Sequence, residues 1–268
     1  TIVLTRRGQE PETITRPPLG ALSPRLVIGS TRPGNLQASS GNPDLQPFEA
    51  VNLDLSLEWY YQPNGYISVA GFRKDVQNFL VNVVQNRVFE IADRDNLFNG
   101  NPTFEVSTQD NLEQASVEGV ELSVQHIFDW LPGPLSGLGF QANATFVSSN
   151  AQLETGDLTQ TFALQGLGDS YNAVAFYELG GLEARVAWNR REKFLQTAVG
   201  FGGEPAYVQP YQQWDARVSY ALTPNLAVFV EGVNLTNEAN QRTGRYDNQI
   251  LLYEETGARY ALGMRADF

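Results

Sequence analysis

Few residues in this chain could carry out chemistry. There is no cysteine and a single histidine, His126, which excludes thiolate nucleophiles, thiolate-bound metals and most imidazole chemistry. Ser170, in the sequence Gly168-Asp169-Ser170, has the neighbours of a hydrolase serine. Such a serine needs a downstream histidine as its base, and without one it is a weak nucleophile. We therefore expect no catalytic residue and no cofactor, and we interpret Ser170 as part of a polar loop that approaches a strand.

A second polar group could bind a cation. Asp93, Asp95, Asn96, Asn99 and Asn101 bring oxygen ligands together within a short stretch, and calcium prefers such ligands. The cluster lacks the regular spacing of a helix–loop–helix calcium site. A hydrophilic loop is the better interpretation, and we expect no metal.

Charge and hydropathy exclude other classes of protein. The chain has 268 residues with 30 acidic and 18 basic side chains, a net charge of −12. The sequence pI near 4.5 excludes a basic nucleic-acid surface. Hydrophobic residues make up 42% of the chain, so it can fold. No stretch approaches the roughly 20 apolar residues that a spanning helix needs, whereas a membrane barrel needs only strands of about 9 to 11 alternating residues.

The dominant periodicity is two, which is that of a β-strand. Between Val51 and Trp59, apolar residues occupy every odd position and polar residues every even one. Alternation recurs throughout the rest of the chain, at 120–125, 140–146, 182–189, 213–220 and 259–268. Counting the less regular segments as well, the sequence predicts about nine strands after residue 48.

The connections between these strands alternate between short and long. Turn-forming residues occupy the short ones, at 62–65, 131–137, 180–181 and 222–225. The long ones span roughly 75–115, 148–170, 190–210 and 235–257. Tight turns at one end and long polar loops at the other are typical of an outer-membrane barrel, with brief periplasmic turns and extended external loops.

Alternation alone does not separate a membrane barrel from a soluble sandwich, because a sandwich also has one apolar and one charged face. Two further features favour the barrel. The predicted strands exceed the usual five or six residues, and aromatic side chains gather near strand ends, as an interfacial girdle requires; they are Trp59, Tyr60, Tyr61, Trp188, Tyr211, Trp214 and Tyr220. We expect an all-β, antiparallel, up-and-down transmembrane barrel portion of about nine to ten strands.

The order of several short motifs resembles the TonB-dependent receptors of the Gram-negative outer membrane. Residues 42–49 are similar to the segment that precedes a late barrel strand in that family, and 117–121 to one of its strand starts. The sequence Glu231-Gly232-Val233-Asn234-Leu235-Thr236-Asn237 matches the end of its penultimate strand. The chain stops at Phe268, which is similar to the aromatic terminus that barrel-assembly machinery recognises. The resemblance covers roughly residues 12–268.

The resemblance implies a location, a domain organisation and partners. The family has a plugged barrel of about 22 strands, and residues 49–268 would form its C-terminal region, preceded by an irregular, proline-rich loop at 1–48 with one short strand at 22–29. We expect the plug domain and the segment that contacts TonB to be absent here. The implied partners are outer-membrane lipid, the TonB complex in the full-length protein, and a ferric siderophore, cobalamin or carbohydrate.

Ligand contacts are expected in the long loops, whose candidates supply rings, charges and amides: Asn96, Asn99, Lys193, Phe194, Tyr207, Arg242 and Tyr246. The charged residues of the strands, mixed in sign, are expected to line the barrel interior. The alternative that stays open is a soluble β-rich binding module or hydrolase derived from such a barrel.

Overall fold

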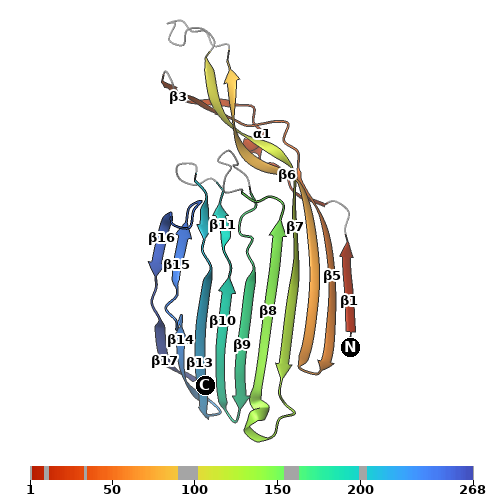
Figure 1. The fold of residues 1–268 in the computed structure, drawn as a ribbon, viewed down its shortest axis with the longest axis vertical. Coiled ribbons are helices and arrows are strands. Elements are labelled where there is room, and N and C mark those ends of the chain that lie inside the picture. The colour runs from red at the N-terminus through yellow and green to blue at the C-terminus, as the bar shows by residue number, and fades with distance from the viewer. Residues whose placement is uncertain are drawn as a thin grey trace. The chain divides into compact units, whose positions relative to one another are not determined.

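The computed structural model describes residues 2–8, 12–32, 35–89, 102–153, 163–198 and 204–267 (Figure 1). They fall into two compact units. The first unit comprises residues 1–7, 53–73 and 117–268, and the second comprises residues 8–52 and 74–116. Each is described by itself below.

Strands dominate both units. Four have residues in both: β1 (Ile2–Gly8), β5 (Phe48–Gln62), β6 (Gly65–Val88) and β7 (Thr103–Ile127). The first unit continues with η1 (Gly133–Gly137), β8 (Leu138–Ser149), β9 (Ser170–Leu179), β10 (Leu182–Arg191), β11 (Phe194–Thr197), β12 (Ala206–Val208), β13 (Tyr211–Thr223), β14 (Leu226–Val233), β15 (Ala239–Thr243), β16 (Ile250–Glu255) and β17 (Arg259–Ala266). The second unit also has β2 (Glu12–Thr15), α1 (Leu19–Leu22), β3 (Leu26–Arg32) and β4 (Asn35–Ser40). Within the described residues, no helix combines the length and hydrophobicity that crossing a membrane requires.

The main sheet follows the chain as a meander. Its strand order is β1-β5-β6-β7-β8-β9-β10-β13-β14-β17, and every neighbouring pair from β7 to β17 is antiparallel. β8, β9, β10 and β13 lie side by side in Figure 1. In the described part of the chain, nine of these strands begin at or after residue 48, from β5 to β17. The prediction of an antiparallel, up-and-down sheet of about this size is confirmed.

The register keeps the apolar residues of neighbouring strands on one face, called here the apolar face. Trp188 of β10 lies opposite Trp214 of β13, and Val218 of β13 lies opposite Val230 of β14. A shift of one residue in the pairing would place the apolar residues of one strand beside the polar residues of the next. The observed register therefore agrees with the alternation seen in the single strands. The opposite side, called the polar face, carries the pair Arg217 and Glu231.

The apolar face is the more exposed one along β5. Leu53, Leu55 and Leu57 have exposed fractions of 46%, 49% and 44%, whereas Asp54 and Ser56 between them are partly covered. In a soluble sandwich this apolar row would be buried against a second sheet. Monomeric soluble proteins rarely expose a large contiguous apolar surface, so the exposed row on β5 favours a barrel over a sandwich.

Two belts of aromatic rings border the apolar face. Near the short turns, Tyr61 stacks on His126 with 5.7 Å between ring centres, and His126 contacts Phe128 at 4.5 Å. The other belt includes Phe146 against Tyr171 at 5.7 Å, and Trp188 against Trp214 at 6.2 Å. On β8 the belts are Phe140 and Phe146, six residues apart, or about 20 Å along a strand. This spacing suits an apolar band about 25 Å tall.

Phenylalanine rings on the polar face cover glycines of the adjacent strand. Phe176 lies opposite Gly139 and Phe229 opposite Gly263, and in each case a Cβ on the glycine would meet the ring. The guanidinium of Arg217 lies 4.2 Å from the centre of the Phe229 ring and 3.2 Å from Glu231. Ring stacking and a charge-assisted hydrogen bond thus hold an ion pair on this face.

The connections predicted as long loops contain more strand than expected. β11, β12, β15 and β16 form a second, four-stranded sheet inside the stretches 190–210 and 235–257. β6 and β7, with 24 and 25 residues, take up much of 75–115. Sequence periodicity missed the strands of the second sheet because they have only three to six residues each, too few for a clear alternation.

The second unit has its own small apolar core. Phe104 and Val106 of β7 and Ala38 of β4 are buried, with Leu26, Leu36 and Phe89 packed against them. β4 runs parallel to β7 here, with Ala38 opposite Val106. Where we expected an irregular segment at 1–48 with one short strand, these residues contain β1 to β4 and α1, and the expected strand is β3. The division of the chain after residue 48 stays a prediction.

Candidate ligand pocket

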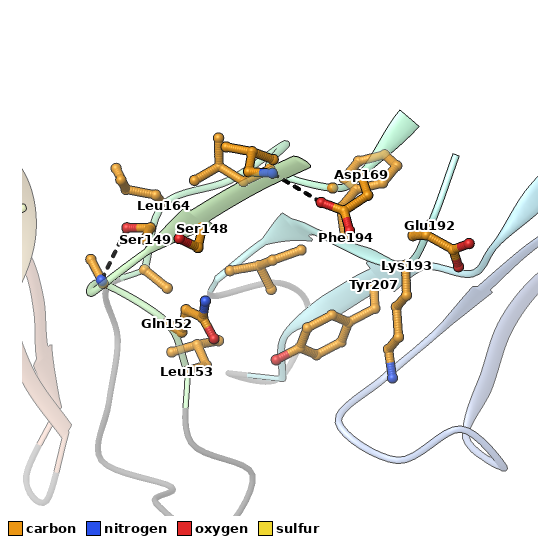
Figure 2. A pocket seen from close by; sticks show the side chains of 16 residues that line it. Ser148, Ser149, Gln152, Leu153, Leu164, Asp169, Glu192, Lys193, Phe194 and Tyr207 are labelled. Atoms are coloured by element: carbon orange, nitrogen blue, oxygen red, sulfur yellow. Dashed lines mark hydrogen bonds between the residues drawn. The ribbon is translucent and has the colours of Figure 1, made fainter. Parts of the chain in front are cut away.

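A pocket of about 340 Å³ opens at the end of the first unit that lies away from the short turns. Its lining comes from the end of β8, the connection before β9, the β10–β11 connection and β12, with residues 147–149, 151–153, 163–164, 167–169, 192–195 and Tyr207 (Figure 2). These segments meet because β8, β9 and β10 are neighbours in the sheet. The strand order therefore gathers into one site residues that are far apart in sequence.

Apolar side chains form one side of the pocket, called here the apolar floor. Ala163 and Leu195 of the lining are buried in one cluster with Ala198, which lies outside the lining, and Leu153 and Tyr207 pack against this cluster. Leu195 of β11 lies opposite Tyr207 of β12, so the pairing of these short strands aligns this surface. The small sheet thereby supplies an apolar floor.

Asp169 forms the polar wall and is partly buried. Its Oδ1 accepts a hydrogen bond of 2.9 Å from the backbone N–H of Val147, and its carbonyl oxygen accepts one of 2.9 Å from the N–H of Glu192. The residue therefore joins the end of β8 to the end of β10. Ser170 begins β9, opposite Thr145, which agrees with the interpretation of a polar loop approaching a strand.

His126 is engaged elsewhere, in the aromatic belt near the short turns. Its Nδ1 lies 2.9 Å from the Tyr61 hydroxyl, and its Nε2 accepts a 3.5 Å hydrogen bond from Trp130. Tyr61 also donates to the backbone carbonyl of Gln125 at 3.1 Å. Both ring nitrogens thus have partners, as expected for a hydrogen-bonded interfacial histidine.

The basic side chains around the pocket already have partners. Lys193 Nζ donates to Asp247 Oδ1 at 2.5 Å and lies 4.8 Å from the Tyr207 ring centre. Arg190 forms a 2.7 Å ion pair with Glu192. Arg191 stacks on Phe194, with 3.7 Å from Cζ to the ring centre. These cations clamp the connections together.

Hydrogen bonds also stabilise the ionised form of Asp247, the partner of Lys193. Asp247 accepts from Lys193 and from Gln209 Nε2, the latter at 3.2 Å, and these two bonds lower the pKa of Asp247 below its ordinary value of 3.8. Gln209 also donates to Thr243 at 2.6 Å. Asp247 is ionised at neutral pH even at its ordinary pKa, and the lowered pKa extends this charged state to more acidic conditions.

The pocket unites some of the predicted ligand contacts. Lys193, Phe194 and Tyr207 line it together. Arg242 lies on β15 opposite Val208, and Tyr246 is 57% exposed in the β15–β16 connection; neither lines the pocket. Asn96, Asn99 and Phe268, like the polar cluster at 93–101, lie outside the described residues. The part that any of these side chains takes in binding stays a prediction.

Sequence reasoning missed Ser148, Gln152 and Asp169, which also line the pocket. Ser148 and Ser149 interrupt the alternation of β8 where the strand ends, which was the available signal. Asp169 was considered only as part of a serine motif, because nothing local shows that it contacts the end of β8. The described residues contain no cluster of three or more His, Cys, Asp or Glu side chains arranged to hold a metal ion.

Comparison with known proteins agrees with this geometry. Residues 12–235 match the family model "TonB dependent receptor-like, beta-barrel". The chain is 24% identical over 229 residues to the iron-regulated outer membrane virulence protein of Vibrio cholerae, covering 85% of this chain and 32% of that protein.

Solved structures share the fold. A ferric enterobactin receptor variant from Pseudomonas aeruginosa, in complex with enterobactin, superposes with a TM-score of 0.64 at 19% identity, covering all of this chain and 38% of the receptor. The siderophore receptor PirA from Acinetobacter baumannii gives 0.60 at 18%, covering 87% of this chain and 34% of the receptor.

The fold and the family match define a class. The chain belongs to the TonB-dependent receptor-like β-barrel family, and its location is the outer membrane, as predicted. The chain spans about a third of the length of the relatives it matches.

Proposed function

We propose that this chain is the C-terminal barrel portion of a TonB-dependent receptor that takes up a ferric siderophore across the outer membrane. The main observation in support is the apolar face, which is exposed, in register across strands and bordered by two aromatic belts. Such a face fits a wall in contact with lipid. The names of the relatives, a siderophore receptor and a ferric enterobactin receptor, support the class of ligand.

The two faces of the sheet and the pocket suggest a role for each part of the chain. The strands form the wall, the polar face borders the interior, and the connections at the pocket end capture the ligand from outside the cell. In the full-length protein, a plug and the TonB complex would provide gating and energy. No bond is made or broken in this process, so the protein would not be an enzyme.

The other ligands and classes have less support. No relative named above carries cobalamin or a carbohydrate in its name. A soluble module would have to leave the apolar face in water, at a cost of roughly 25 cal/mol for each Å² of apolar surface. A hydrolase would need a base for Ser170, and the histidine is already bonded to Tyr61 and Trp130.

The test is uptake by cells. Iron-starved bacteria that carry the full-length gene are expected to accumulate radioactive iron from a panel of siderophores, and to lose this uptake when the gene or tonB is deleted. Cobalamin and an oligosaccharide serve as comparison ligands in the same cells. Uptake of either comparison ligand with no iron uptake, or iron uptake that does not depend on tonB, would contradict the proposal.

A further inference from the structure

We propose that the pocket receives an alkylammonium arm of the iron chelate, with the ammonium at Asp169 and the alkyl stem against the apolar floor. This inference rests on the proposed function and narrows its ligand class. It predicts that the receptor prefers chelates with a positively charged arm over the triply negative chelates that three catecholates form with Fe³⁺.

The first step of the argument is the charge that the pocket presents. Its charged lining residues are Asp169, Glu192 and Lys193. Glu192 is neutralised by Arg190 at 2.7 Å, and Lys193 by Asp247 at 2.5 Å. Asp169 has no ion pair within the described residues. Arg191, which lies over Phe194 just outside the lining, forms no ion pair with them either. Within the lining itself, Asp169 is therefore the carboxylate that remains available to attract a cation.

The second step is the position of that charge. Oδ1 of Asp169 is held by the N–H of Val147, while its other oxygen accepts no hydrogen bond from the part of the chain that the structure describes. In Figure 2, Glu192 and Lys193 direct their charged ends away from Asp169. A fixed carboxylate with a free oxygen is a ready acceptor for an ammonium.

The third step is the surface beside Asp169. Leu153, Leu195 and Ala163 provide the apolar floor, and Phe194 and Tyr207 provide rings. Ser148 and Gln152 offer polar groups at the margin (Figure 2). A methylene stem gains by covering the floor while its charged end stays at the carboxylate. The volume of about 340 Å³ is at the lower end for ligand pockets, which suits one arm of a chelate.

Both rings of the lining already contact a cation of this chain. The guanidinium of Arg191 occupies Phe194 at 3.7 Å, and the ammonium of Lys193 lies 4.8 Å from Tyr207. Ring faces attract cations through their quadrupole. Because these two cations already use the rings, the proposed ammonium depends on the Asp169 carboxylate and not on the rings.

The experiment measures binding of three gallium(III) chelates to the purified full-length receptor by quenching of its tryptophan fluorescence. They are a trihydroxamate with a terminal alkylammonium, the same trihydroxamate with that amine acetylated, and a tris-catecholate of charge −3. We expect the ammonium chelate to bind about tenfold more tightly than its acetylated form, and the catecholate to bind most weakly.

The matched variants assign the effect to one carboxylate. Asp169→Asn keeps an oxygen for the N–H of Val147 and is expected to abolish the difference between the ammonium and acetylated chelates. Glu255→Gln removes an equal charge outside the pocket lining and should leave the difference intact. If Asp169→Asn does not fold, the acetylation comparison on the unmodified receptor still decides.

The outcomes separate this inference from the proposed function. Tighter binding of the catecholate, or an ammonium preference that persists in Asp169→Asn, would overturn the inference while leaving siderophore uptake standing. Binding of none of the three chelates, together with no iron uptake in cells, would overturn the proposed function itself.

Discussion

At the scale of single residues, Asn234 shows a structural reason for the asparagine in the motif Glu231–Asn237 at the end of β14. Its backbone φ of 55° lies in the left-handed region, and its side chain is almost fully buried. Its Oδ1 accepts from the N–H of Glu238 at 2.8 Å, and its Nδ2 donates to the carbonyl of Glu238 at 3.1 Å. Its own N–H donates to Asp215 on the neighbouring strand. Asparagine tolerates this conformation better than most residues.

Asn234→Ala is expected to destabilise the first unit by about 1–3 kcal/mol, because it removes both side-chain bonds and places alanine in a strained conformation. Unfolding in urea, followed in detergent micelles by tryptophan fluorescence, measures the loss. Asn234→Gly keeps the conformation accessible and should lose less. Equal losses in the two variants would show that backbone strain does not contribute.

The ion pair of Lys193 and Asp247 makes a prediction about pH. The pKa of Asp247 is lowered in the folded protein, so its contribution to stability is present above the pKa of the unfolded chain and is lost as the pH falls through the lower, folded pKa. Lys193→Met should return the pKa of Asp247 towards 3.8. The carboxyl carbon resonance of Asp247 reports the titration, and Arg242→Met, which removes a cation that does not bond to Asp247, should leave the midpoint in place.

At the scale of strands, the glycines on the polar face allow close approach. Gly119 of β7 has the ring of Phe72 on one side and the carbonyl oxygen of Phe146 on the other, both where a Cβ would stand. Gly71 of β6 differs, because the nearest atom to a Cβ there would be the carbonyl oxygen of Gly119, at 3.9 Å. A Cβ would therefore clash at Gly119 but would have room at Gly71.

Gly119→Ala is expected to cost about 1–3 kcal/mol, because the methyl group would displace the backbone of β8. Gly71→Ala, in the same part of the sheet, should be neutral or slightly stabilising. The stabilities of the two variants can be compared on unheated denaturing gels after incubation at increasing urea concentrations. The measured quantity is the fraction of protein that still migrates as the folded form. Similar losses for both would argue against the close approach at Gly119.

At the scale of the whole molecule, the two faces of the sheet should respond differently to charge. Leu122 of β7 lies on the apolar face and is 40% exposed, and Ser123 beside it lies on the polar face. Leu122→Lys is expected to cost about 2–4 kcal/mol in lipid, as at the midplane of other barrels, while Ser123→Lys should change little. Folding yield into phospholipid vesicles gives the comparison. Equal tolerance of lysine at both positions would contradict contact with lipid.

The sequence by itself determined which residues share a face. Side chains alternate along any strand, so Leu53, Leu55 and Leu57 had to lie together before any pairing was known. It also indicated the order of strands, since short turns leave little choice but to pair consecutive segments. The aromatic belts followed from the same alternation, because rings near strand ends were already visible at Trp59, Trp188 and Trp214.

Only the tertiary structure showed that the apolar residues of β5 are exposed and where the pocket lies. Alternation is the same in a sandwich and in a membrane wall, and the exposure of the leucines on β5 favours the wall. The pocket depends on contacts such as that between Lys193 and Asp247, 54 residues apart, and on a small sheet built from four short strands. Such pairings depend on the register of distant segments, which no local pattern of side chains specifies.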